Sequence, residues 1–509
     1  MILSPYKRAG WPQWSWLFPS LVSATAILYG GVFALAAPAF ALPLLAPVAV
    51  LGALSIWALP NAKAPTGPIE PLYFAFFAAL FMWPDYLAFS LPGLPWITLT
   101  RLIELPLAVV TLAGVSMSAN FRSEFACLKG PARPVCKMLL ILIVIEFVTL
   151  PFAYDKRVSV QKLVNAQFDW TLTFFASCYV FRKPGPLIRW VYILLGMTIF
   201  LCVMGALENE EGHVLWLGHI PSFLKIDDAD ARAILAGGFR NGRYRVQAIF
   251  GTSLEFAQYL ALAFPFVLYL ATSARRIRVR AVAAATLPLM VYVTLTTGSR
   301  LGVIGIFVAF LAYLLLWAVL KWRRDKSSII GPAIALAYPA ILGLTVAATF
   351  VSHRLGAVVW GNGPQNASDA GRAEEWRLAG AKILSNPVGH GIGMGAAALN
   401  YHQPDGLLTI DSYYLSTALE FGVIGFLVYY GSIVYSMYLC ARALSVAKEG
   451  EDFLLMPIAS SMAAFMFTSS VLSETETHPI VFMLLGMTAA LVHRRNGVWA
   501  SRASSRNVR

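Results

Sequence analysis

Apolar segments long enough to cross a membrane follow one another along almost the whole chain, with short polar breaks between them. Each holds roughly the 17 to 25 residues that an α-helix needs to cross a hydrocarbon core about 30 Å thick. The segments are continuous and lack the alternation of barrel strands, so they predict helices, which satisfy their own backbone groups. We predict 12 to 14 spans, the lower number applying if the polar segment 97–117 and the short segment 137–153 do not cross. The predicted spans are 17–37, 39–59, 69–90, 97–117, 137–153, 165–181, 187–207, 246–272, 281–297, 300–320, 329–351, 411–440, 453–473 and 478–494.

Composition supports this fold class. Hydrophobic residues make up 58% of the 509-residue chain and charged residues only 13%. A soluble domain with that balance would expose far too much apolar surface to water. We therefore expect an all-α, polytopic membrane helix bundle that forms one integral membrane domain over residues 1–509.

The distribution of charge predicts the orientation of the bundle. The net charge is +13, but the basic residues lie mainly in short turns between apolar segments rather than in one patch for nucleic acid. The basic turns at 275–280 and 321–324 are typical of the cytoplasmic side, and the turn at 473–476 is acidic. With both termini in the cytoplasm and an uncleaved first span, the long loops at about 208–245 and 352–410 fall outside. In a bacterial inner membrane this side is the periplasm.

Ionisable residues within the predicted spans are biased toward the outer side. Such residues are costly in lipid and mark either paired helices or a functional path. Their shared bias predicts a polar cavity that opens outward. The residues concerned are Arg101, Glu104, Asp169, Glu255 and Glu420. The five cysteines form no Cys-x-x-Cys pair and support neither a disulfide framework nor a zinc site.

Two basic motifs precede the second long loop. The segment Arg243-Tyr244-Arg245 leads from the first long loop into a span, and Thr297-Gly298-Ser299-Arg300 forms a tight outward hairpin between two spans. Arg300 lies where a span re-enters the membrane, on a turn too short to hold the side chain in open solvent. The alternative for Arg300 is a side chain that extends to the lipid head groups.

A surface helix is predicted within the second long loop. Ser368 or Asp369 is a suitable N-cap and Asn386-Pro387 a suitable end, so residues 370–385 should be helical. Trp376, Ala379 and Ile383 would line one face of a helix that lies along the membrane surface.

Arg372 begins that helix, where free backbone N–H groups and the helix dipole already favour an anion. A guanidinium there can bind phosphate oxygens through two hydrogen bonds. The alternative is a surface arginine paired with Glu374 or Glu375. Glycines at 389, 391, 393 and 395 follow, and their N–H groups could also bind phosphate.

Asp411 opens the next span in the segment Asp411-Ser412-Tyr413. A carboxylate at this place can act as general base on an acceptor hydroxyl, or it can be the N-cap of the helix. His402, nine residues earlier, is an alternative base. Glu420 lies about half a turn from Asp411 on a helix of 3.6 residues per turn, so we assign it to packing. Gly422 and Gly425 should allow a neighbouring helix to approach closely.

These motifs, in this order over residues 243–430, resemble those of the O-antigen ligase and O-antigen polymerase superfamily. The resemblance implies a C-type membrane glycosyltransferase fold with short helices in a large periplasmic loop. It also implies transfer of a glycan from an undecaprenyl diphosphate carrier to a sugar hydroxyl, with inversion and without metal or cofactor. Arg300 and Arg372 match the family's diphosphate-binding arginines. Ligases typically have a histidine where this chain has Asp411, a departure that points toward a polymerase within the same glycosyltransferase class.

The resulting hypothesis assigns Arg300, Arg372 and Asp411 to catalysis and Arg243, Arg245 and His402 to substrate binding. The expected partners are the lipid-linked donor, a glycan or lipid A-core acceptor, membrane lipids and other polysaccharide assembly proteins, but no nucleic acid. A polymerase that joins lipid-linked repeat units is the nearest alternative. A flippase for lipid-linked oligosaccharide is the alternative from another class, but the expected internal repeat of a transporter is not evident.

Overall fold

The computed structural model describes residues 62–89, 97–125, 130–226, 243–351, 366–402, 410–447, 450–472 and 477–506, with the isolated positions 52, 235, 239–240 and 408. The predicted spans 17–37 and 39–59 lie outside these continuous ranges. Every other predicted span contains a helix. The principal helices are α2 (Ile69–Met82), α3 (Leu99–Met117), α5 (Arg133–Thr149), α6 (Lys156–Ala166), α7 (Thr173–Val180), α8 (Pro186–Glu211), α10 (Ser253–Ser273), α11 (Ile277–Thr296), α12 (Arg300–Arg324), α13 (Ile330–Val351), α17 (Tyr413–Leu444), α18 (Leu455–Thr468) and α19 (His478–Arg506).

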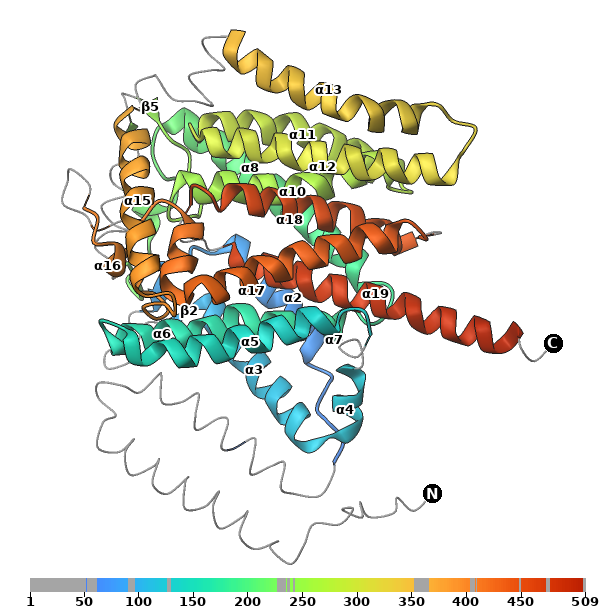
Figure 1. Cartoon of the computed structure of the whole chain (residues 1–509), viewed down its shortest axis with the longest axis horizontal. Coiled ribbons are helices and arrows are strands. Elements are labelled where there is room, and N and C mark those ends of the chain that lie inside the picture. The colour runs from blue at the N-terminus through green and yellow to red at the C-terminus, as the bar shows by residue number, and fades with distance from the viewer. Residues whose placement is uncertain are drawn as a thin grey trace, which may run out of the picture.

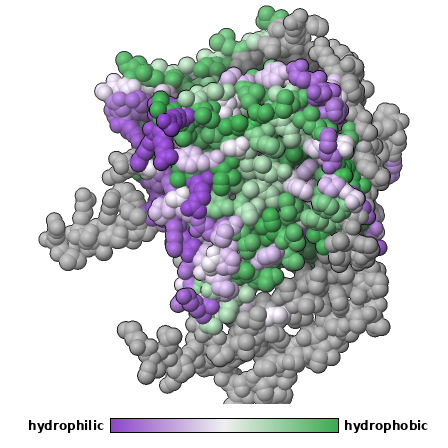
Figure 2. Space-filling view, turned by 180° about the vertical axis from the view of Figure 1, so that it is seen from behind, coloured by the Kyte–Doolittle hydropathy of each residue, from purple (hydrophilic) through white to green (hydrophobic). Residues whose placement is uncertain are grey.

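The polytopic helical membrane fold is confirmed. Within the described ranges, eight helices are long and apolar enough to cross a membrane, and α2 is a shorter apolar helix. Figure 1 shows the bundle helices running side by side. Figure 2 shows apolar residues over the middle of the flank and hydrophilic residues toward its edges, as expected for a bundle surrounded by lipid.

Some predicted spans are shorter or interrupted. The segment at 165–181 is divided into a π-helical turn (Gln167–Leu172) and α7. The helix predicted from residue 246 begins only at Ser253, because Thr252 and Glu255 form a capping box that starts α10. The apolar residues just before it are buried in a turn against the bundle, which hydropathy alone does not distinguish from a span.

Short elements lie between the long helices. They are α4 (Ala119–Glu124), α15 (Asn366–Ser385), α16 (Gly395–Leu399), the strands β1 (Ala88–Phe89), β2 (Ile97–Thr98) and β3 (Leu224–Lys225) in the order β2-β1-β3, and the antiparallel pair β4 (Phe239–Arg240) and β5 (Arg243–Tyr244). Figure 1 shows α15 running across the ends of the bundle helices, near α16 and β5. We call this the α15 end of the bundle.

Small residues bring α12 close to α10. A Cβ added to Gly302 would lie 2.5 Å from Ala257 Cβ, and one added to Gly305 would lie 2.9 Å from Ala261 Cβ and 3.0 Å from Thr468 Cγ2. Such close approach is typical of helix packing in membranes, where dispersion contacts replace the hydrophobic effect. The start of α12 is thereby held beside the early turns of α10 and the last turn of α18.

Helix α17 is longer than a membrane crossing requires and is broken inside. Its 32 residues would extend about 48 Å at 1.5 Å per residue, against a hydrocarbon core of about 30 Å. The backbone leaves the helical region at Gly422, with φ 68° and ψ −175°. The backbone N–H of Tyr413 donates to Ser469 O at 2.9 Å, which ties the start of α17 to the end of α18. The starts of α12 and α17 therefore lie at the same end of the bundle.

Candidate active site

Arg372 and Asp411 meet at the α15 end of the bundle. Arg372 Nε lies 3.6 Å from Asp411 Oδ2, and both side chains remain about a third exposed. Glu374 pairs with Arg377, whereas Glu375, the other partner considered for Arg372, lies within electrostatic range of it. Arg372, the proposed cation, belongs to α15, and Asp411, the proposed base, precedes α17 and lies 39 residues later in the chain. Their side chains meet at a partly exposed surface.

The N-cap interpretation of Asp411 is wrong. Ser412 occupies the N-cap of α17, and its side chain makes no capping hydrogen bond. Because Asp411 lies one residue outside the helix, its carboxylate points to Arg372 rather than to the first turn.

Glu375 is the member of this group that the sequence did not single out. Its residue is 1% exposed, and its Oε2 accepts a hydrogen bond from the backbone N–H of Asp411 at 2.9 Å. Burial, together with the nearby Asp411 carboxylate, raises the pKa of Glu375 to about 7, although the Asp411 amide and the Arg372 guanidinium oppose the shift. The signal in the sequence was its i+3 spacing from Arg372, which places both residues on one face of α15.

An apolar cluster fixes α15 against α16 and α17. It consists of Ala379, Ala398, Leu399, Ile410, Leu415 and Leu419, all buried. The predicted helix is therefore confirmed, but it begins at Asn366, so Ser368 and Asp369 lie inside it rather than at its cap. Trp376 is 51% exposed and does not join Ala379 on the packed face.

Arg245 and Arg300 form a second basic group. Arg245 Nε donates to Thr297 O at 2.9 Å, and the Arg245 side chain lies across Gly298 at 3.3 Å from the position a Cβ would take. Arg300 is the first residue of α12, directly after the N-cap Ser299. Arg245 therefore contacts the hairpin that joins α11 to α12, and Arg300 directly follows that hairpin.

A buried carboxylate holds the segment that carries Arg245. Glu208, at the end of α8, accepts from Tyr244 Oη at 2.7 Å, from Gln247 N at 3.0 Å and from Ala248 N at 2.8 Å. Ala248 has a φ of 53°, an unfavourable conformation for a residue with a Cβ. We call residues 244–250 the arginine arch; the Glu208 carboxylate offsets its strain.

The comparison with protein families identifies the part of the chain that contains α12, α15 and the first half of α17. Residues 285–430 match a family model described as O-antigen ligase. These residues form an O-antigen ligase domain. Members of the family are enzymes of the ligase or polymerase type that transfer lipid-linked glycans. No curated protein sequence matches the chain.

The O-antigen ligase domain contains four of the predicted site residues, Arg300, Arg372, His402 and Asp411, while Arg243 and Arg245 precede it. His402 is exposed and forms an isolated bridge with Leu408. The roles of all six residues remain predictions.

In the glycine-rich loop of the O-antigen ligase domain, the amides of Gly389, Gly391 and Gly395 are already bonded within the protein. Its amides donate to α17: His390 N to Leu419 O at 2.8 Å, and Gly391 N to Glu420 O at 3.0 Å. These carbonyls lose their helical partners at the break at Gly422, and a buried carbonyl needs a replacement donor. The loop completes the broken helix and its bound amides cannot bind phosphate.

Glycines permit that contact. A Cβ on Gly422 would lie 2.1 Å from Pro387 O, and one on Gly389 would lie 2.4 Å from Glu420 O. Gly422 thus admits a loop rather than the neighbouring helix that we expected. Glu420 has the predicted packing role, because its Oε1 accepts from Gly395 N at 3.2 Å and from Ser416 Oγ at 3.0 Å.

Charged residues of the first half gather near the glycine-rich loop, because a Cβ added to Gly393 would lie 2.7 Å from Lys162 Cγ. Asp169 lies within electrostatic range of Asp85, Arg101 and Lys162, and Glu104 lies near Asp169. Within the described part of the chain, no group of three or more His, Cys, Asp or Glu side chains could hold a metal ion.

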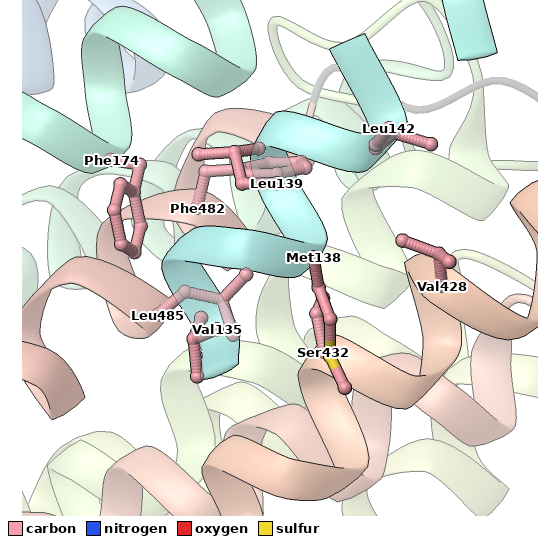
Figure 3. A pocket seen from close by; sticks show the side chains of 9 residues that line it. All are labelled: Val135, Met138, Leu139, Leu142, Phe174, Val428, Ser432, Phe482 and Leu485. Carbon is pink, nitrogen blue, oxygen red and sulfur yellow. The ribbon is translucent and has the colours of Figure 1, made fainter. Parts of the chain in front are cut away.

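A narrow crevice between helices is visible in Figure 3, lined by residues of α5, α7, α17 and α19. Its volume is about 10 Å³, and apart from Ser432 its lining is apolar. A space of that size holds about one water molecule, so the crevice is not the expected polar cavity for a glycan.

Proposed function

We propose that the protein transfers a glycan from an undecaprenyl diphosphate carrier to a sugar hydroxyl at the periplasmic face, as an O-antigen ligase does, with inversion and without metal. The observation that carries the proposal is the approach of Arg372 to Asp411, at the end of the bundle where α12 presents Arg300. A cation for the departing phosphate and a base for the acceptor are the two groups this reaction requires.

The proposed reaction is a single displacement. The acceptor oxygen attacks the anomeric carbon and transfers its proton to the Asp411 carboxylate. The bond from the anomeric carbon to the phosphate oxygen breaks, and its electron pair leaves with the diphosphate. Arg372, Arg300 and Arg245 stabilise that negative charge by charge-assisted hydrogen bonds, and attack opposite the leaving group inverts the anomeric centre.

The direct test is transfer by purified protein, supplied with an undecaprenyl diphosphate glycan and an acceptor. We expect Arg372→Ala, Arg300→Ala and Asp411→Asn to lower the rate by at least about a hundredfold, the usual cost of losing one electrostatic or acid–base group. Arg377→Ala is the matched control, because Arg377 also lies on α15 but pairs with Glu374 at the exposed surface. Full activity in all three site variants contradicts the assignment.

A polymerase remains a second candidate, because Asp411 occupies the place of the ligase histidine. Two acceptors separate the reactions: lipid A-core for a ligase, and a second lipid-linked repeat unit for a polymerase. Movement of the lipid-linked glycan across liposomes without a new glycosidic bond would instead indicate a flippase. The assay includes EDTA, because the loop at 208–245 carries Asp228-Ala229-Asp230, a spacing that can bind metal. Loss of transfer in EDTA contradicts metal independence.

A further inference from the structure

Glu375 is the most deeply buried charged group beside the proposed site. It is 1% exposed, whereas the side chains of Arg372 and Asp411 are 27% and 30% exposed. A fully buried carboxylate is retained only where hydrogen bonds or opposite charge compensate its desolvation. Here the compensation comes from the Asp411 amide and from Arg372.

The hydrogen bond from Asp411 acts on the backbone rather than on the side chain. The Asp411 N–H lies just before the N-cap of α17 and donates to Glu375 Oε2 at 2.9 Å. Because α15 packs on α17 through the apolar cluster that contains Ala379 and Leu415, this bond sets where the Asp411 backbone lies relative to Arg372. A carboxylate placed by the backbone keeps its orientation when substrate enters.

Glu375 also shares Arg372 with Asp411. Both carboxylates lie near the one guanidinium, and the two carboxylates repel each other. The charge of Arg372 that is available to a bound diphosphate therefore depends on the charge of Glu375.

We propose that Glu375 is a positioning residue for the transfer reaction: it fixes the Asp411 backbone and controls how strongly Arg372 binds the donor diphosphate. The inference rests on the proposed function, because it gives Arg372 and Asp411 their roles.

The pKa of Glu375 near 7 allows a test of its proposed control over donor binding by Arg372. The charged groups within electrostatic range of Glu375 are Arg372 on α15 and Asp411 before α17. Two further titratable residues, Tyr401 and His402, follow α16 in the chain. Below pH 7 Glu375 is neutral and the charge of Arg372 is opposed by Asp411 alone. Above pH 7 the second carboxylate ionises, so binding of an anionic diphosphate should weaken as pH rises.

The experiment measures the KM for an undecaprenyl diphosphate glycan from pH 6 to pH 8.5 in the full-length protein. For the wild type we expect KM to rise several-fold, with about tenfold per pH unit as the limit for one linked proton. In Glu375→Gln the amide oxygen still accepts from Asp411 but does not titrate, so KM should be flat while kcat is nearly kept. Glu375→Ala loses both functions, so kcat should fall at every pH.

Two controls separate this effect from others. Glu374→Gln removes the exposed neighbour and should keep the pH slope of the wild type. His402 is exposed and is the alternative base, and the slope should also persist in His402→Asn.

Three outcomes contradict the inference: a wild-type slope that persists in Glu375→Gln, a kcat that is unchanged in Glu375→Ala, or a slope that His402→Asn abolishes. If the wild type transfers no glycan, the proposed function itself fails and this inference fails with it. If the wild type transfers but Glu375 has no effect, only the inference fails.

Discussion

At the scale of single residues, the contacts that matter most join positions with no local motif. Glu208 binds the arginine arch from 36 to 40 residues away, and Glu375 binds the amide of Asp411 over 36 residues. Hydropathy gives no sign of these pairs, since each carboxylate looks like an ordinary polar residue in its helix. The family resemblance placed Arg372 and Asp411 in one site. Physical chemistry alone predicted only that an arginine can bind phosphate and that a carboxylate can act as a base.

Glu208 gives the first prediction at this scale. Glu208→Ala leaves the amides of Gln247 and Ala248 without their acceptor, and a buried unsatisfied donor costs about 1–3 kcal/mol. We expect a lower thermal unfolding midpoint in detergent and a higher KM for the lipid-linked donor, because the arginine arch is released. Glu210→Ala is the control, since Glu210 lies on the same helical turn but is exposed. Equal effects of the two variants would show that the three hydrogen bonds do not hold the arch.

A substitution at Glu375 should raise the unfolding midpoint, whereas Glu208→Ala should lower it. Its pKa is about 7 in the folded protein against an ordinary value of 4.5, so the folded state binds the proton more tightly than the unfolded state. The stability from this group is therefore present at low pH and lost between about pH 4.5 and 7. We expect Glu375→Gln to raise the unfolding midpoint relative to the wild type at pH 8 but to leave it nearly unchanged at pH 5. A difference that is larger at pH 5 would contradict the raised pKa.

At the scale of elements, continuous apolar runs predicted helices well, because a span must be apolar over a fixed length. The ends were harder to predict. Residues 246–250 are mostly apolar and buried but not helical, and the capping box at Thr252 decides where α10 begins. The glycine-rich loop shows a similar difficulty: glycine spacing indicates close approach of a backbone but not which group approaches. Here that group is the broken turn of α17.

The break in α17 can be tested with two glycine substitutions in the same helix. Gly422→Ala places a Cβ 2.1 Å from Pro387 O at a left-handed φ of 68°, so we expect strong destabilisation and poor recovery of folded protein. Gly431→Ala meets no atom within 4 Å in regular helix, where alanine is favoured by about 0.5–1 kcal/mol, so it should be neutral or stabilising. Size-exclusion profiles and unfolding midpoints in detergent measure both. If Gly422→Ala behaved like Gly431→Ala, the loop could not be docked in the helix break.

At the scale of the whole molecule, composition and hydropathy were sufficient for the fold class, and the charge of the turns for a predicted orientation. The number of spans is harder to predict from the sequence, because α7 and α18 are short and α17 is longer than one membrane crossing. The gathering of Arg372, Asp411 and the start of α12 at one end follows from helix packing that hydropathy does not encode. It depends on contacts such as Gly305 with Thr468 and Tyr413 with Ser469.

The orientation itself makes the last prediction. Ser385 ends α15 at the site, and Ser327 lies in the turn between α12 and α13 at the opposite end of the bundle; both are exposed. Four of the five native cysteines are buried thiols outside any disulfide, and Cys127 is first replaced by serine. Because the basic turns favour the cytoplasm, a membrane-impermeant maleimide should label Ser385→Cys in intact spheroplasts but Ser327→Cys only after lysis. The reverse pattern would place Arg372 and Asp411 in the cytoplasm, away from a periplasmic acceptor, and would remove the compartment in which the proposed transfer takes place.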